Sequence, residues 1–208
     1  NTILLKHAGN CPQEALRIAD LVTEAGSPDG VYQNVFASND QVARMIAHPL
    51  LQGVSLTGSE RAGRAVGGVA GANLKKSVLE LGGSDAFIVL ADADLDLADR
   101  DAATGRFANA GQACTSSKRL IVEDAVWDDF LEAFLARAQE WAPGDPREET
   151  TKLGPMSSLA ARADLVAQVE DAVAKGATVH LGGSYPKGPA PSTRPRSSPV
   201  LTPPCAPT

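Results

Sequence analysis

Residues 53–83 decide the fold of this chain, and they read GVSLTGSERAGRAVGGVAGANLKKSVLELGG. The stretch contains a strand pattern at Gly53 to Leu56, a helix pattern at Ser59 to Ala72 and a second strand pattern at Ser77 to Leu81. The helix is rich in glycine and alanine, so it can pack closely on a sheet. Strand–helix–strand order predicts two parallel strands of one sheet.

The same alternation of strands and helices surrounds this stretch. Strands are predicted at Ile3 to Leu5, Val31 to Phe36 and Ala86 to Leu90, and helices are predicted to begin at Pro12 and Asp40. Pro12 suits the first turn of a helix, because the N–H that it lacks would have no partner there. Repeated units of this kind predict an α/β fold with a parallel, Rossmann-like sheet covered on both faces.

A second α/β unit is predicted after Gly83. A helix is expected from Leu95 to Ala110, and a strand from Arg119 to Val122. We therefore expect one partial domain over residues 1–82 and another over residues 83–183. Aromatic residues make up only 4% of the chain, so the cores are expected to consist mostly of Ala, Val, Leu and Ile.

The last part of the chain, residues 184–208, has a different character. Eight prolines and no acidic residue occur between Pro186 and Thr208. Such a stretch lacks the apolar surface that would offset its ordering entropy. It is either a disordered tail or the product of a coding frame that shifted near Gly183, and we favour the shifted frame.

Charge, apolar runs and cysteine usage exclude several classes of function. The net charge of −6 and the lack of a basic stripe argue against a nucleic-acid partner. Three scattered cysteines (Cys11, Cys114 and Cys205) suit neither a disulfide framework nor a metal site, and a reducing cytoplasm is the expected location. No apolar run reaches membrane-spanning length, so no membrane partner is expected.

Cys114 is the candidate nucleophile. It lies in the sequence Gly111-Gln112-Ala113-Cys114-Thr115-Ser116-Ser117-Lys118-Arg119. A lone cysteine is most often a packed core residue, but these polar and small neighbours make a poor core and favour an exposed loop. A thiol that attacks a carbonyl needs such an accessible position.

Glu80 is the candidate base, in Leu79-Glu80-Leu81-Gly82-Gly83. A strand-end carboxylate is commonly an ordinary solvated group. The apolar residues that flank Glu80 instead favour a partly buried side chain at a sheet edge. A carboxylate placed there suits the activation of water.

Two weaker signals point to a phosphate-containing ligand. Thr57-Gly58-Ser59 ends a strand and begins a helix, where free N–H groups and the helix dipole attract anions. Ser59 is equally well explained as a simple helix cap. Lys6 follows a strand and would lie at the carboxyl edge of the sheet, where nucleotides bind.

Together these residues resemble the aldehyde dehydrogenase superfamily from about Thr2 to Gly183. The most specific pieces of the resemblance are Leu79-Glu80-Leu81-Gly82-Gly83 and Gly111-Gln112-Ala113-Cys114. The resemblance implies a cofactor-binding domain over 1–82 and a catalytic domain over 83–183. It also implies the oxidation of a small aldehyde to the acid through a cysteine thiohemiacetal and thioester.

The resemblance implies a role for each candidate residue. Cys114 would be the nucleophile and Glu80 the base that activates the deacylating water. Gly58 and Ser59 would contact the cofactor diphosphate, Lys6 the adenosine ribose, and the Leu81 backbone would lie near the nicotinamide. No metal ligand is implied.

The resemblance also bears on the coenzyme and on the branch of the family. Relatives that prefer NAD often carry a glutamate three residues after the lysine, where this chain has Gly9. Without that carboxylate Lys6 can pair with a 2′-phosphate, which favours NADP or dual use of NADP and NAD. The stretches from Leu5 to Gln13 and from Gly53 to Gly63 look most like the succinate-semialdehyde dehydrogenase branch.

The resemblance is to the central part of a family subunit. The chain begins downstream of the family's Trp-Asn segment, whose asparagine completes the oxyanion hole, and ends before its Glu-x-x-Gly-Pro segment. We therefore expect a fragment that is inactive alone, from a parent that is a homo-oligomer. Two alternatives stay open: a non-catalytic remnant, and a coenzyme A-acylating dehydrogenase, which Glu80 disfavours because those relatives lack this carboxylate.

Overall fold

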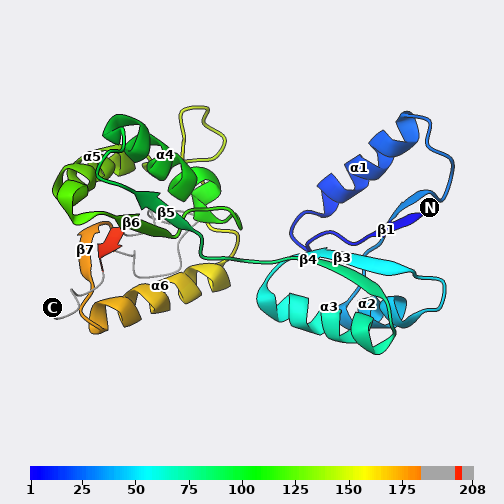
Figure 1. The fold of residues 1–208 in the computed structure, drawn as a ribbon. Coiled ribbons are helices and arrows are strands. Elements are labelled where there is room, and N and C mark those ends of the chain that lie inside the picture. The colour runs from blue at the N-terminus through cyan, green and yellow to red at the C-terminus, as the bar shows by residue number, and fades with distance from the viewer. Residues whose placement is uncertain (184–199, 203–208) are drawn as a thin grey trace. The chain divides into compact units, whose positions relative to one another are not determined.

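Two units make up the computed structural model, Asn1–Leu81 and Gly82–Thr208. The structure describes residues 1–183 and the backbone of residues 200–202 (Figure 1). Each unit is built from strands that alternate with helices, so the predicted α/β class with parallel strands is confirmed.

The first unit contains two pairs of parallel strands. Strand β1 (Ile3–Leu5) pairs with β2 (Tyr32–Asn34), and β3 (Gly53–Thr57) pairs with β4 (Lys76–Glu80). Each pair forms a separate two-stranded sheet among the described residues, whereas the sequence predicts one continuous sheet. Local patterns identify strands, whereas the partner of each strand depends on the packing of the whole unit.

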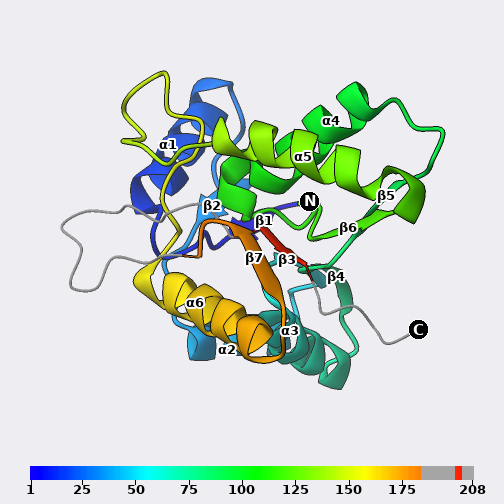
Figure 2. The same cartoon turned by 90° about the vertical axis from the view of Figure 1, so that its left-hand side faces the viewer.

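Three helices of the first unit begin where local sequence signals place them. Helix α1 (Pro12–Glu24) has its proline in the first turn, and α2 (Asn39–Ala47) follows a capping box in which Ser38 and Gln41 bond reciprocally. Helix α3 (Glu60–Ala72) packs on β3 and β4 and lies beside α2 on the same face of these strands (Figures 1 and 2). The sequence 53–83 therefore forms the predicted strand–helix–strand unit.

The second unit is built around a further parallel pair, β5 (Ala86–Val89) and β6 (Arg119–Val122). Helices α4 (Leu95–Phe107) and α5 (Trp127–Gln139) pack together on one side of these strands, and α6 (Leu159–Ala174) lies on the other (Figures 1 and 2). The short 3₁₀ segments η1 (Ala108–Gly111) and η2 (Asp124–Val126) adjoin α4 and α5.

Another strand pair in this unit reaches into the predicted tail. Strand β7 (Thr178–Leu181) pairs with β8 (Val200–Thr202) in antiparallel orientation. The stretch 184–208 therefore includes one short strand, which its prolines and missing periodicity conceal in the sequence. The rest of the predicted tail lies outside the described residues.

Three phenylalanines lie at the centre of the core of the second unit, and the other members of the buried cluster are aliphatic, as composition predicts. The ring centroids of Phe107 and Phe134 lie 6.1 Å apart, and those of Phe130 and Phe134 lie 5.7 Å apart. Val89, Ala102, Ala103, Ala138 and Leu153 complete the buried cluster. Three of the few aromatic residues are thus packed together, and bulk composition does not report such a distribution.

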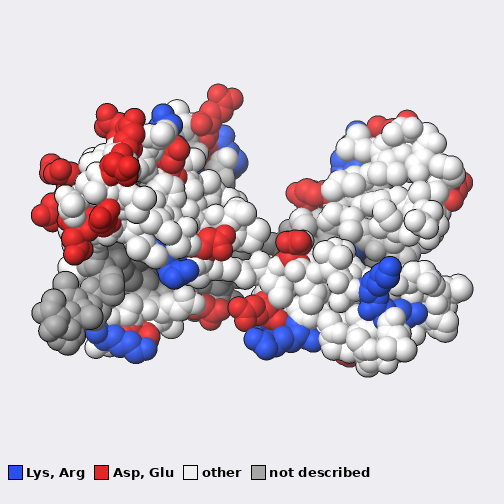
Figure 3. Space-filling view, viewed as in Figure 1, with Lys and Arg blue, Asp and Glu red and all other residues white. Residues whose placement is uncertain are grey.

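The negative charge of the chain gathers on this unit. Figure 3 shows acidic side chains crowded over α4 and α5. The exposed carboxylates of these two helices include Asp96, Asp101, Asp128, Asp129 and Glu132. Cys114 lies outside this acidic surface, in the turn between η1 and β6.

Candidate active site

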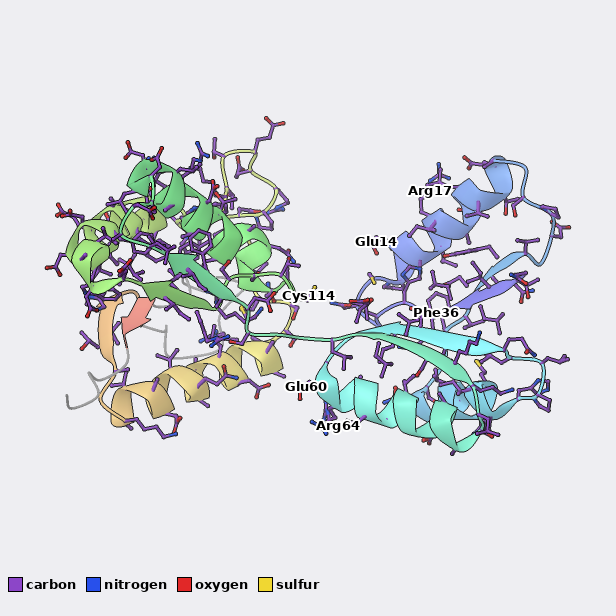
Figure 4. The ribbon with its side chains drawn as sticks, in the orientation of Figure 1. Glu14, Arg17, Phe36, Glu60, Arg64 and Cys114 are labelled. Atoms are coloured by element: carbon purple, nitrogen blue, oxygen red, sulfur yellow. The ribbon has the colours of Figure 1, made fainter. Side chains whose placement is uncertain are left out.

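Cys114 is exposed and its thiol is free. It lies in the turn between η1 and β6, and Figure 4 shows its side chain at the surface of the second unit. The prediction that Cys114 occupies an exposed loop is confirmed. The position leaves the sulfur accessible to a small electrophile.

The chain reaches this turn through three consecutive residues with left-handed backbone. The φ angles of Asn109, Ala110 and Gly111 are 52°, 57° and 71°. Such residues do not continue a right-handed helix, so the helix predicted to reach Ala110 ends at Phe107. The left-handed turn redirects the chain from α4 toward Cys114.

Gly111 is the residue in this turn for which a side chain is least tolerable. A Cβ atom there would lie 2.5 Å from a guanidinium nitrogen of Arg106 and 2.9 Å from the Arg106 carbonyl oxygen. Burial lowers the pKa of the Arg106 guanidinium. The first glycine of the cysteine motif is thus required both by its positive φ and by close packing.

Two side chains of the cysteine motif hold the turn in place. The Lys118 ammonium donates to the carbonyl oxygens of Ala113, Cys114 and Ser116 at 3.1, 3.2 and 3.0 Å. The Gln112 amide joins the turn to a distant segment, because it donates to the Pro155 carbonyl at 3.3 Å. Sequence analysis did not predict these roles of Lys118 and Gln112. The only signal in the sequence is that both residues lie close to Cys114.

The segment Leu79-Glu80-Leu81-Gly82-Gly83 ends beside the turn that carries Cys114. A Cβ atom on Gly83 would be 3.9 Å from the carbonyl oxygen of Cys114. The Arg119 guanidinium donates to the Ser84 carbonyl at 2.8 Å, which links the start of β6 to the same segment. Two stretches that are about thirty residues apart in sequence are therefore neighbours within the second unit.

Glu80 is the last residue of β4, in the first unit. Its backbone lies opposite Thr57, and its carbonyl accepts the N–H of Gly58 at 3.0 Å. The side chain is exposed, so the partial burial expected from its apolar neighbours is wrong for this unit. Alternation along a strand places Leu79 and Leu81 on the face opposite to Glu80, and apolar sequence neighbours therefore do not enclose its carboxylate.

Gly58, Ser59 and Leu81 meet at the carboxyl ends of β3 and β4. The Ser59 hydroxyl accepts the N–H of Ala62 at 3.3 Å, which makes Ser59 the N-cap of α3. The Leu81 side chain packs against the backbone of Gly63 in the first turns of α3. Lys6 follows β1 directly, at the carboxyl end of that strand, and its side chain is exposed.

Five of the six candidate residues therefore belong to the first unit and Cys114 belongs to the second. Within residues 1–183 and 200–202, no group of three or more His, Cys, Asp and Glu side chains could hold a metal ion. Over the same described part of the chain, no helix is long and apolar enough to cross a membrane.

Comparison with known proteins identifies the family. The profile of the aldehyde dehydrogenase family matches residues 1–196. The chain is 51% identical over 203 residues to the NADP(+) succinate-semialdehyde dehydrogenase of Deinococcus radiodurans, with 98% of this chain and 43% of that protein covered. It is 46% identical over 183 residues to NADP(+) succinate-semialdehyde dehydrogenase 1 of Mycobacterium bovis, with 88% and 40% covered. The chain belongs to the aldehyde dehydrogenase family.

A solved structure agrees with this assignment. Succinic semialdehyde dehydrogenase from Streptococcus pyogenes, crystallised in complex with NADP+ as the cofactor, superimposes with a TM-score of 0.86 at 45% identity. The match covers 90% of this chain and 41% of that chain. The present chain thus spans less than half the length of each of these three relatives.

The similarity reaches further along the chain than the sequence motifs indicate. The resemblance seen in the sequence ends at about Gly183, whereas the family profile extends to residue 196. The expected limit at Gly183 is therefore wrong. Proline-rich composition hides this part of the match, because it carries none of the distinctive motifs.

Proposed function

We propose that the whole protein is an NADP-dependent dehydrogenase that oxidises succinate semialdehyde to the carboxylic acid, with Cys114 as its nucleophile. The main support is the free, exposed Cys114 on a turn that packs beside Gly83. The substrate and the coenzyme are proposed because the relatives described above are NADP-dependent succinate-semialdehyde dehydrogenases. We further propose a homo-oligomeric protein in the cytoplasm, where a reducing environment suits its few cysteines.

The first chemical step uses the sulfur and the backbone of Cys114. The thiolate adds to the aldehyde carbon, and the carbonyl oxygen becomes an alkoxide. The Cys114 N–H has no acceptor within residues 1–183 and 200–202, so it is available to donate to this oxygen. When the carbonyl forms again with loss of hydride, Cys114 is left holding a thioester, and NADP+ would supply the hydride acceptor.

Glu80 serves the second half of the proposed reaction. Its carboxylate takes a proton from water, and the hydroxide formed attacks the thioester carbonyl. The carbon–sulfur bond then breaks, which releases the acid and returns Cys114 as the thiolate, and Glu80 gives its proton to the solvent. An exposed carboxylate at the end of a strand has the access to water that this role needs.

The start of α3 fits the diphosphate of a dinucleotide. Helix α3 has 13 residues, and the Ser59 hydroxyl occupies the N–H of Ala62. In the part of the chain that the structure describes, the N–H groups of Glu60 and Arg61 have no acceptor, so they remain available to phosphate oxygens. Exposed Lys6 would hold the adenosine ribose, and the space around Gly9 is open.

The test is an assay of the polypeptide encoded by the continuous reading frame that contains this chain. With succinate semialdehyde and NADP+, we expect formation of NADPH and free acid. Cys114→Ser should abolish both products. Glu80→Gln should give one rapid equivalent of NADPH followed by slow turnover, because the thioester forms and is not hydrolysed. No NADPH from the intact frame would refute the proposal, and a coenzyme A thioester as product would favour the acylating alternative.

A further inference from the structure

Lys118 forms several hydrogen bonds with the turn that carries the nucleophile Cys114. Its ammonium group donates to three backbone carbonyls, those of Ala113, Cys114 and Ser116, at 3.1, 3.2 and 3.0 Å. An ammonium group has three protons, so these contacts use its full donor capacity. Three carbonyl groups of the turn therefore point at one ammonium group, which comes from a residue only four positions after Cys114.

These contacts set the direction of two peptide planes. In a trans peptide the C=O and the following N–H point in opposite directions. Because the Ala113 and Cys114 carbonyls point at Lys118, the N–H groups of Cys114 and Thr115 point away from it. Neither N–H has an acceptor in the described residues, so both stay available to an external oxygen.

Other hydrogen bonds hold the ends of the turn but do not orient its centre. The N–H of Ser116 donates to the Ala113 carbonyl at 3.2 Å, and the N–H of Ser117 donates to the Gly105 carbonyl at 3.1 Å. Across the described part of the chain, Lys118 alone donates to the Cys114 carbonyl. Loss of this ammonium therefore leaves the peptide that follows Cys114 free to rotate.

We propose that Lys118 is a positioning residue, which orients the Cys114 and Thr115 peptide groups so that their N–H groups face a reactant at the sulfur. It acts through the backbone of Cys114 and does not contact the reacting atoms. An effect of Lys118 on aldehyde oxidation rests on the function proposed above. Its effect on the reactivity of the Cys114 thiol can be measured in this chain without any aldehyde.

The first test is alkylation of the 208-residue chain by iodoacetamide at neutral pH, with each cysteine followed by peptide mass spectrometry. We expect Lys118→Met to slow alkylation of Cys114 roughly tenfold, the equivalent of one charge-assisted hydrogen bond, while the rate at Cys11 is unchanged. Lys118→Arg retains a cationic donor, but its planar guanidinium cannot direct three bonds from one nitrogen, so it should restore only part of the lost rate.

The matched control is Lys175→Met, which removes an exposed lysine that pairs with Asp171 at 2.7 Å on α6. It should leave the Cys114 rate unchanged. If Lys118→Met behaves like Lys175→Met, the proposal is wrong.

A second measurement uses the wild-type chain and does not depend on whether a variant folds. In amide hydrogen exchange resolved by NMR, the Cys114 and Thr115 amides should exchange fast, while those of Ser116 and Ser117 should be protected by their acceptors. Protection of Cys114 and Thr115 equal to that of Ser116 would overturn the proposal.

An enzymatic arm separates this inference from the proposed function. In the intact reading frame Lys118→Met should lower kcat about tenfold with little change in KM, and Lys118→Arg should recover part of the lost kcat. If the intact frame oxidises no aldehyde but Cys114 alkylation still depends on Lys118, the proposed function fails and the positioning role stands.

Discussion

The side-chain oxygen of Gln112 accepts the backbone N–H of Ser157 at 2.7 Å, across 45 positions in sequence. Together with the bond from its amide nitrogen to Pro155, this contact ties the cysteine motif to the segment that precedes α6. The glutamine is half-buried, so water replaces these bonds poorly. Gln112 therefore organises the part of the second unit around Cys114.

Replacing Gln112 tests this connection. We expect Gln112→Ala to lower the free energy of unfolding of the second unit by about 1–2 kcal/mol, because it leaves Ser157 and Pro155 without their partner. Gln112→Glu should cost less, since its carboxylate still accepts the Ser157 N–H. Urea unfolding followed by tryptophan fluorescence measures this directly, because Trp127 and Trp141 both lie in this unit. Equal effects of the two substitutions would contradict the assigned pairing.

Two glycines of α3 should respond in opposite directions to alanine. A Cβ atom at Gly63 would lie 2.7 Å from the Leu81 side chain, whereas one at Gly68 would meet nothing within 4 Å. Gly68→Ala should stabilise the first unit by about 0.5–1 kcal/mol through helix propensity. Gly63→Ala should lose this gain and destabilise, because Leu81 must move. Amide hydrogen exchange of α3 measures both, and stabilisation by Gly63→Ala would show that Leu81 is not held against the helix.

A buried carboxylate joins α4 to α5. Asp99 is 3% exposed and accepts from the Arg137 guanidinium at 3.4 Å. Arg137→Ala should destabilise the second unit by about 1–3 kcal/mol, because the buried carboxylate loses its charged partner. Arg100→Ala removes an exposed ion pair with Asp101 and should change stability by less than about 0.5 kcal/mol. Tryptophan-monitored urea unfolding distinguishes them, and equal losses would show that Asp99 does not depend on Arg137.

The coenzyme preference can be reversed at two exposed positions. Lys6→Met should weaken binding of NADP more than that of NAD, by about tenfold, if the ammonium pairs with the 2′-phosphate as we propose. Gly9→Glu should add a carboxylate that repels this phosphate, and the open space at Gly9 admits its side chain. Calorimetric titration of the chain with each coenzyme gives the ratio of affinities. A ratio unchanged by both substitutions would place the 2′-phosphate elsewhere.

Local signals predicted much of this fold. Pro12 and Ser59 mark helix starts that the structure confirms, because caps and first-turn prolines depend on neighbouring residues alone. The end of α4 was not predictable in this way. Asn109 and Ala110 adopt positive φ without being glycine, which requires support from surrounding packing.

The candidate site likewise has features that the local sequence predicts and features that depend on the tertiary structure. The sequence by itself determined the family, the nucleophile candidate Cys114 and the strand–helix–strand unit around α3, because each is carried by residues that are close together in the chain. The tertiary structure alone decided that Gln112 reaches Ser157, that Gly83 lies beside Cys114 and that Glu80 is exposed in its unit. It also decided which carbonyls Lys118 meets. Such contacts depend on how the backbone turns in space, and a residue pattern does not encode that direction.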